Sequence, residues 1–185
     1  FFYSNGEIQL IAPAGPVSIS AVHGFETAEH TGQVVVKANE TTRFKLKLEQ
    51  IWDASDHGWY SGDNHFHLNY GGTHRLTPDD MILPMRGEAL DVALPLLANL
   101  HNRFLEQNLW GWSHAQDPII LFGQEVRSHF LGHLELVGTT ELYWPWVWGP
   151  GYQLYGTDDR INAEVLRFGR DNGGLGGYVH PVGVE

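Results

Sequence analysis

The sequence contains no cysteine, so neither a disulfide nor a zinc–thiolate site is available to it. Cations are also scarce, since 11 Lys and Arg stand against 22 Asp and Glu and the formal net charge is −11. Sequence-independent binding of nucleic acids or of acidic lipid surfaces needs a basic surface, and we therefore expect neither partner. No apolar run reaches the roughly 18 residues of a transmembrane helix, so we expect no membrane span.

The chain also lacks an initiating Met and a charged-then-apolar segment at its start, which is Phe1-Phe2-Tyr3. We therefore expect an internal start, which leaves a removed signal peptide open. Apolar residues make up 42% of the 185 residues. That is enough for a hydrophobic core and predicts one domain, or one domain with a small module.

Histidine, by contrast, is abundant: the chain has 11, and nine of them lie at position 57 or later. Histidine is the commonest metal ligand in proteins and also a general acid or base. In an acidic chain without cysteine, this abundance favours a hard or borderline metal ion bound by nitrogen and oxygen.

Two parts of the chain differ in pattern. In residues 1–52, short alternating runs such as 17–21 and 44–48 are separated by Pro and Gly, which predicts about four short antiparallel strands. Four strands suit part of an immunoglobulin-like or carboxypeptidase-regulatory-like β module. Residues 56–185 alternate strand-like and helix-like segments, which predicts an α/β layer or barrel.

The second part is expected to contain five strands and two helices. The helices begin with an N-cap Thr, followed by acidic residues that suit the positive end of the helix dipole. The expected strands are 59–68, 91–98, 119–122, 134–137 and 176–180, and the expected helices are 77–89 and 157–170.

The clearest motif is Asp63-Asn64-His65-Phe66-His67. Side chains two apart on a strand share a face, so Asp63, His65 and His67 are expected to point the same way, away from Asn64 and Phe66. Two imidazoles with a carboxylate behind them make a metal-binding edge. The alternative is a pair of surface histidines on a half-exposed strand.

Other ligand-type residues follow predicted strands. His101 follows the run 91–98, Glu125 follows 119–122, and His180 closes the last strand before Pro181. Polar residues at the carboxyl ends of barrel strands commonly form active sites, and a carboxylate such as Glu125 can bridge two cations. The alternatives are a turn at His101 and a salt-bridged strand end at Glu125.

Three further residues complete the candidate site. His133 precedes the strand 134–137, whereas His74 lies in a Gly-rich loop and Arg103 beside His101. We expect His74 and Arg103 to contact an anionic leaving group or oxyanion, with a solvated loop as the alternative for His74.

An aromatic cluster runs from Tyr143 to Tyr155 and is interrupted by Pro and Gly. It predicts a loop, which either stacks on an apolar or sugar-like substrate or packs over the core. Packing is the preferred interpretation.

The order of these motifs resembles the PHP (polymerase and histidinol phosphatase) superfamily across residues 56–185. The segments 58–63 and 69–73 are similar to the CehA/McbA, carbaryl-hydrolase-like branch, and the β module resembles the one that precedes such domains. The resemblance implies a distorted (βα)7 barrel that holds two or three divalent ions (Zn, Mn or Fe). Carried over by position, the metal ligands are His65, His67, His101, Glu125, His133 and His180.

Two features depart from the family pattern. Leu100 stands where the family usually has Asp, and the family's last strand end, which completes the metal shell, is not present before Glu185. About three barrel strands would follow, so we expect either that the sequence is part of a longer chain or that the metal centre is incomplete and inactive.

The predicted function is a metal-dependent hydrolase, in which a metal-bridged hydroxide cleaves phosphoester, carbamate or carboxyl-ester bonds of a small molecule. Asp63, Glu125, Arg103 and His74 are the candidate catalytic residues. The alternatives are a non-catalytic module that binds glycan or protein around a degenerate or structural metal site, and a metal carrier. The β module favours a secreted or periplasmic location.

Overall fold

A computed structural model of the chain describes residues 1–70, 75–97, 106–128, 130–149 and 160–180. The chain forms two compact units. The first unit comprises 1–61 with 82–91, and the second comprises 62–81 with 92–185. In the described ranges, no helix has both the length and the apolar composition needed to cross a membrane.

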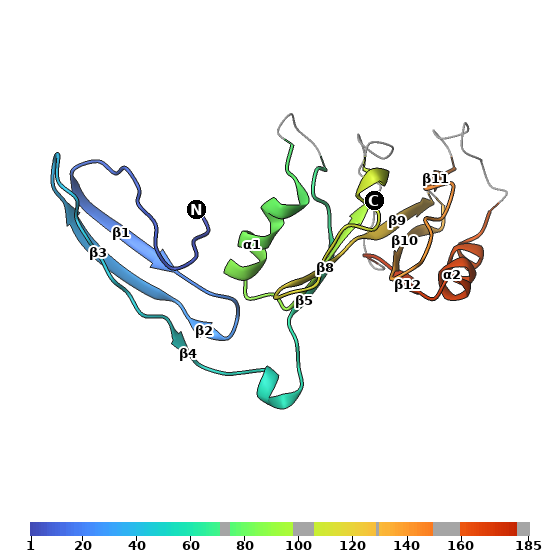
Figure 1. Ribbon diagram of the computed structural model, residues 1–185, viewed down its shortest axis with the longest axis horizontal. Helices are drawn as coiled ribbons and strands as arrows, with labels where there is room; N and C mark the ends of the chain where they lie inside the picture. The colour runs from blue at the N-terminus through green and yellow to red at the C-terminus, as the bar shows by residue number, and fades with distance from the viewer. Residues whose placement is uncertain (71–74, 98–105, 129, 150–159, 181–185) are drawn as a thin grey trace. The chain divides into compact units, whose positions relative to one another are not determined.

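The first unit is built on a hairpin of two seven-residue strands, β1 (Gly15–Ala21) and β3 (His30–Val36), paired antiparallel (Figure 1). Half-buried and exposed residues alternate along both strands, as the sequence pattern predicts for the run 17–21. A second antiparallel pair joins β2 (Thr27–Ala28) to β4 (Glu49–Gln50).

The strand expected at 44–48 is wrong, because these residues form no strand and β4 begins only at Glu49. The apolar alternation has another cause. The ring of Phe44 lies against the backbone of Gly32 in β3, where a Cβ added to the glycine would stand 2.6 Å from the ring. Phe44 therefore covers the hairpin through its side chain without joining a ladder of hydrogen bonds.

The helix expected over 77–89 is shorter and differently capped. A 3₁₀ turn (Pro78–Met81) precedes α1 (Ile82–Gly87). Thr77 does not accept a bond as an N-cap; its N–H and hydroxyl both donate to Asp80, at 2.7 Å each. Pro84 inside α1 has no N–H to donate to the residue four before it, which keeps the first turn from being α-helical.

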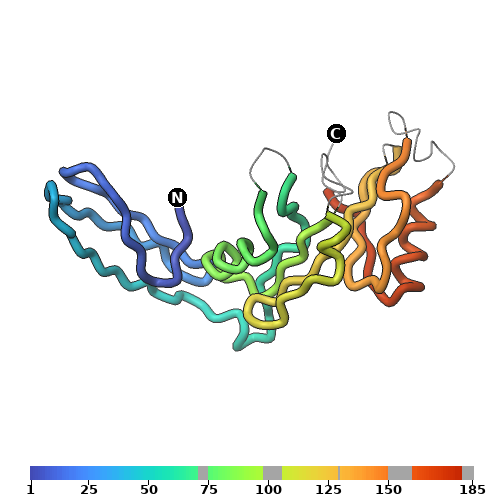
Figure 2. The backbone as a smooth tube through the Cα atoms, turned by 45° about the horizontal axis from the view of Figure 1, so that its top comes forward, coloured from blue at the N-terminus to red at the C-terminus, as the bar shows by residue number. Residues whose placement is uncertain are grey.

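The second unit is a mixed sheet of eight strands (Figure 2). The central strand β6 is parallel to β5, β8 and β9, whereas β10 is antiparallel to β9 and to β12. Short strands complete the edges, since β7 pairs with β8 and β11 with β9. The strands are β5 (Gly62–Phe66), β6 (Val92–Leu97), β7 (Ser113–His114), β8 (Ile119–Leu121), β9 (Gly123–Ser128), β10 (Gly132–Val137), β11 (Val147–Trp148) and β12 (Leu175–Tyr178).

One face of the β9–β10 hairpin forms the hydrophobic core. Val126, Leu134 and Leu136 are buried against Val165 of α2 (Asn162–Asp171) and against the ring of Trp148. Figure 1 shows α2 beside β10 and β12. Because strand side chains alternate, the neighbours of these apolar residues on β9 and β10 project to the opposite face.

The fold class is therefore mixed α/β, with more strand than helix. The strands expected at 91–98 and 134–137 are confirmed within two residues at each end, whereas those at 59–68 and 176–180 are shorter than expected. The predicted helix 157–170 appears as α2, and its expected cap at Thr157 lies outside the described residues. No (βα)7 barrel is formed by the described residues, because β10 pairs antiparallel with both β9 and β12.

Candidate metal site

The candidate site is centred on Glu125, whose side chain is only 1% exposed. The sequence pattern places Glu125 directly after the strand 119–122. That strand is present as β8, but Glu125 lies inside a further strand, β9, which the pattern does not predict. All six residues of β9 are buried, with β6 and β11 on one side and β10 on the other. The carboxylate is thus fixed on a rigid central strand, on the face opposite Val126.

Four histidines surround this carboxylate. Two of them come from the first motif: His67 Nε2 lies 2.9 Å from Oε2, and His65 Nε2 lies 4.0 Å from the same oxygen. The other two come from the C-terminal half: His133 Nδ1 lies 2.8 Å from Oε1, and His180 Nε2 lies 3.8 Å from it. The structure therefore brings together five of the six residues predicted as metal ligands.

The position of each histidine follows from the local fold. His133 lies in β10, opposite Arg127 of β9, and cross-strand partners in an antiparallel pair share a face. His180 lies two residues beyond β12 with a φ of 33°, a left-handed conformation that turns the chain at the strand end. Its ring stacks on that of His65, with centroids 5.3 Å apart.

Arg127 is a fifth neighbour that the sequence pattern did not single out. It lies two residues after Glu125, on the same face of β9, and its Nη2 donates to Oε2 at 2.6 Å. Its guanidinium also lies 5.7 Å from the centre of the Tyr70 ring. The two-residue spacing that identified His65 and His67 would have found Arg127 as well.

These contacts determine the ionisation of Glu125. Burial alone would raise its pKa, but hydrogen bonds from His133, His67 and Arg127 outweigh burial and hold the pKa well below the usual range. At His65 burial has the larger effect and lowers the pKa of the ring, although Glu125 opposes it. A buried carboxylate that stays ionised beside an unprotonated imidazole is a donor pair suited to a cation.

A bulge in β5 modifies the predicted alternation. Asp63 Oδ1 accepts the backbone N–H of His65 at 3.0 Å, which braces this irregular part of the strand. Asn64, expected on the opposite face, instead donates to Glu135 at 3.2 Å. Glu135 lies directly opposite Glu125 in the β9–β10 pair, so Asn64 reaches the same polar face.

The donor set fits a metal ion. One ligand atom from each of His65, Glu125 and His180 lies within 4.8 Å of the other two. Nitrogen and carboxylate oxygen suit borderline divalent ions such as Zn²⁺, and two His with one Glu is a ligand set that catalytic zinc sites use. His67 Nδ1 also lies 2.9 Å from the carbonyl oxygen of Leu96, the kind of backbone contact that fixes a ring beside a metal.

Three predicted site residues, His74, His101 and Arg103, lie outside the described residues, as does His129. His114 lies in β7 and is not one of the histidines around Glu125. Its Nδ1 lies 2.7 Å from the carbonyl oxygen of Pro118, which ties β7 to the start of β8.

In its described part, the aromatic cluster mainly packs in the hydrophobic core and does not form a surface on which a substrate could stack. Tyr143, Trp146 and Trp148 are buried, whereas Trp144 is half exposed. The preferred interpretation, packing over the core, is thus confirmed for these three rings. Tyr152 and Tyr155 lie outside the described residues.

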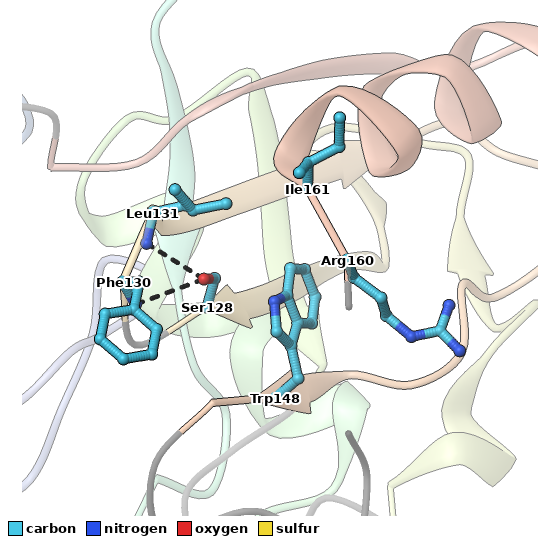
Figure 3. Close-up of a pocket in the computed structure, with 6 residues that line it drawn as sticks. All are labelled: Ser128, Phe130, Leu131, Trp148, Arg160 and Ile161. Atoms are coloured by element: carbon cyan, nitrogen blue, oxygen red, sulfur yellow. Dashed lines mark hydrogen bonds between the residues drawn. The ribbon is translucent and has the colours of Figure 1, made fainter. Parts of the chain in front are cut away.

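A shallow pocket lies at the end of β9 and shares no residue with the Glu125 cluster (Figure 3). In Figure 3 Trp148 lies between Ser128 and Arg160, and the Ser128 hydroxyl accepts the N–H groups of Phe130 and Leu131. The lining residues are Ser128, Phe130, Leu131, Trp148, Arg160 and Ile161. The Ser128 hydroxyl is thus used by local backbone groups, and Arg160 Nη1 donates to the Tyr143 hydroxyl at 3.5 Å.

Comparison with known proteins gives no relative: no family model, no curated protein and no solved structure matches the chain. The function is therefore inferred from the residues of the site.

Proposed function

We propose that the chain contains the metal centre of a metal-dependent hydrolase of the PHP type, CehA/McbA branch, acting on a small-molecule phosphoester, carbamate or carboxyl ester. The observation that carries the proposal is the buried Glu125, surrounded by histidines that three separate segments contribute. A purely structural salt bridge needs one cation, whereas this carboxylate has four imidazoles and a guanidinium around it.

The residues of this chain have distinct roles in the proposal. His65, Glu125 and His180 would hold a divalent ion, and His67, His133 and Arg127 orient the carboxylate through short contacts. When bound, the ion would supply Lewis acidity and lower the pKa of a water molecule to near neutrality. Asp63 braces the strand that carries His65, and therefore acts on geometry. Arg103 and His74 remain candidates for contact with the developing negative charge.

The same proposal includes the fold: the second unit would be part of a distorted (βα)7 barrel. In such a barrel the early strands run parallel, as β5, β6, β8 and β9 do here. Ligands in such barrels come from several strands, and here they come from β5, β9, β10 and the end of β12. The non-catalytic alternative has less support, because three of the four aromatic rings described in the segment from Tyr143 to Trp148 lie in the core.

The test is a metal and activity screen of the intact protein. The wild type, a His65→Ala/His180→Ala variant and a His114→Ala control are reconstituted with Zn²⁺, Mn²⁺ or Fe²⁺. We expect the wild type and the control to bind metal and to hydrolyse chromogenic phosphoesters or carboxyl esters, and the double variant to lose both properties. Wild-type protein that binds none of the three ions would refute the proposal.

A further inference from the structure

The contacts of Glu125 leave little room for more than one ion. A carboxylate has about four lone-pair directions, two on each oxygen. On Oε2 both are used, by Arg127 Nη2 at 2.6 Å and by His67 Nε2 at 2.9 Å. On Oε1 one is used, by His133 Nδ1 at 2.8 Å. Within the described part of the chain, one direction remains, on the oxygen that lies nearest to His180.

The distances also distinguish the histidines that are placed to bind an ion from those that hydrogen-bond to the carboxylate. Two atoms bound to one tetrahedral zinc ion at 2.0–2.1 Å stand roughly 3.4 Å apart. His65 Nε2 lies 4.0 Å from Oε2 and His180 Nε2 lies 3.8 Å from Oε1, close to that separation but beyond hydrogen-bonding distance. His67 is at hydrogen-bonding distance from Oε2 and His133 from Oε1. An ion on Oε2 would have to displace both His67 and Arg127.

The position of the Arg127 cation agrees. Its guanidinium is only 6% exposed and is paired with Oε2 of Glu125. An ion bound to the same oxygen would place two positive charges beside this buried cation.

We propose that Arg127 takes the place of a second metal ion, so that the centre holds a single divalent ion bound by His65, Glu125 and His180. His67 and His133 then position the carboxylate and do not bind metal. This inference rests on the proposed function, but it differs from the two or three ions that the family resemblance implies. Three protein ligands leave a coordination position for water, as in mononuclear catalytic zinc sites.

The first test is metal stoichiometry of the intact wild-type protein, by isothermal titration with Zn²⁺ and by elemental analysis after desalting. One equivalent per chain is expected. Two or more equivalents would overturn the inference and leave the hydrolase proposal standing, whereas no bound metal would overturn both. Electron paramagnetic resonance of Mn²⁺-loaded wild type gives a second measure, because a lone ion shows uncoupled hyperfine lines and a close pair shows exchange coupling.

The second test is the residue itself. Arg127→Met frees Oε2, and we expect the stoichiometry to rise from one ion to two. Arg127→Lys keeps the charge and should stay at one. Arg160→Met is the matched control, since Arg160 contacts Tyr143 and not Glu125, and it should also stay at one. If Arg127→Met binds a single ion while folded by circular dichroism, Arg127 does not set the count. If it fails to fold, the resonance spectrum of the wild type decides the nuclearity.

Discussion

Gln124 and Tyr143 pair like two strand residues, although one partner is a side chain. The Gln124 amide nitrogen donates to the Tyr143 carbonyl at 2.8 Å, and its carbonyl oxygen accepts the Tyr143 N–H at 2.8 Å. The Gln124 side chain is fully buried. This pair attaches the aromatic segment to β9, one residue from the metal-site carboxylate.

Replacing Gln124 by Leu should therefore destabilise the protein strongly. The substitution leaves the N–H and C=O of Tyr143 buried without partners, at about 1–3 kcal/mol for each group. We expect the free energy of unfolding in urea to fall by about 2–5 kcal/mol. The exposed Gln107→Leu is the control and should change it by less than about 0.5 kcal/mol. Equal effects of the two substitutions would show that the Gln124 pair contributes little.

Gly123 tests the packing of β9 against its neighbours. A Cβ at this position would lie 2.7 Å from Leu96 Cδ2 and 3.0 Å from the Leu136 carbonyl oxygen. Gly123→Ala should cost about 1–3 kcal/mol, because overpacking forces both neighbouring strands to shift. At Gly177 the added Cβ would lie 3.5 Å from Glu135, an ordinary contact, so Gly177→Ala should be nearly neutral in the same urea titration.

The stability of the metal-free protein should depend on acid through Glu125. The folded pKa of this group lies below its ordinary value of 4.5, so the unfolded chain binds more protons in that range. The stabilisation is thus complete above the ordinary value and is lost as the pH falls towards the lower folded pKa. We expect a steep decline of unfolding free energy in acid for the wild type and a shallower one for Glu125→Gln.

The exposed Glu141→Gln serves as control for this acid series and should follow the wild type. Glu125→Gln should also be less stable at neutral pH, by about 3–5 kcal/mol, because it leaves the Arg127 cation buried without a counter-charge. A Glu125→Gln curve parallel to the wild type throughout would contradict the assignment of the acid dependence to this residue.

Metal binding should stabilise the fold by linkage. A ligand at 100 times its Kd adds about 2.7 kcal/mol to the free energy of unfolding, provided that it binds only the native state. We expect Zn²⁺ to raise the Tm of the wild type and of His114→Ala, and to leave the Tm of His65→Ala/His180→Ala unchanged in differential scanning calorimetry. An equal rise in all three proteins would indicate binding elsewhere.

The sequence predicted the chemistry of the site better than its geometry. His65 and His67 both reach Glu125, as their two-residue spacing predicts, although His67 lies one residue beyond β5 and the strand is irregular. The pattern places Glu125 after a strand and not inside one, because the polar segment Gln124–Ser128 lacks the apolar composition of a buried strand. Its burial depends on pairing with β6, which is distant in the sequence, as well as with β10.

Two other differences between the predicted and the observed structure have causes that cannot be read from the local sequence. The bulge in β5 breaks the alternation at Asn64, and bulges depend on the register of the partner strand. The segment Thr77-Pro78-Asp79-Asp80 has the residues of a helix start and predicts a longer helix, whereas Pro84 removes one backbone donor from it. The mixed sheet, with β10 and β12 antiparallel, likewise follows from tertiary pairing and not from local pattern.

The stacking of His65 on His180 has a consequence for folding. These rings belong to opposite ends of the second unit and lie 5.3 Å apart. Closing so long a loop costs conformational entropy that rises with the logarithm of its length. An ion bound by both rings would work as a removable cross-link. The affinity that a titration measures would then include the ordering of Val179 and His180, and chelation would loosen these two residues before the hairpin of β9 and β10 opens.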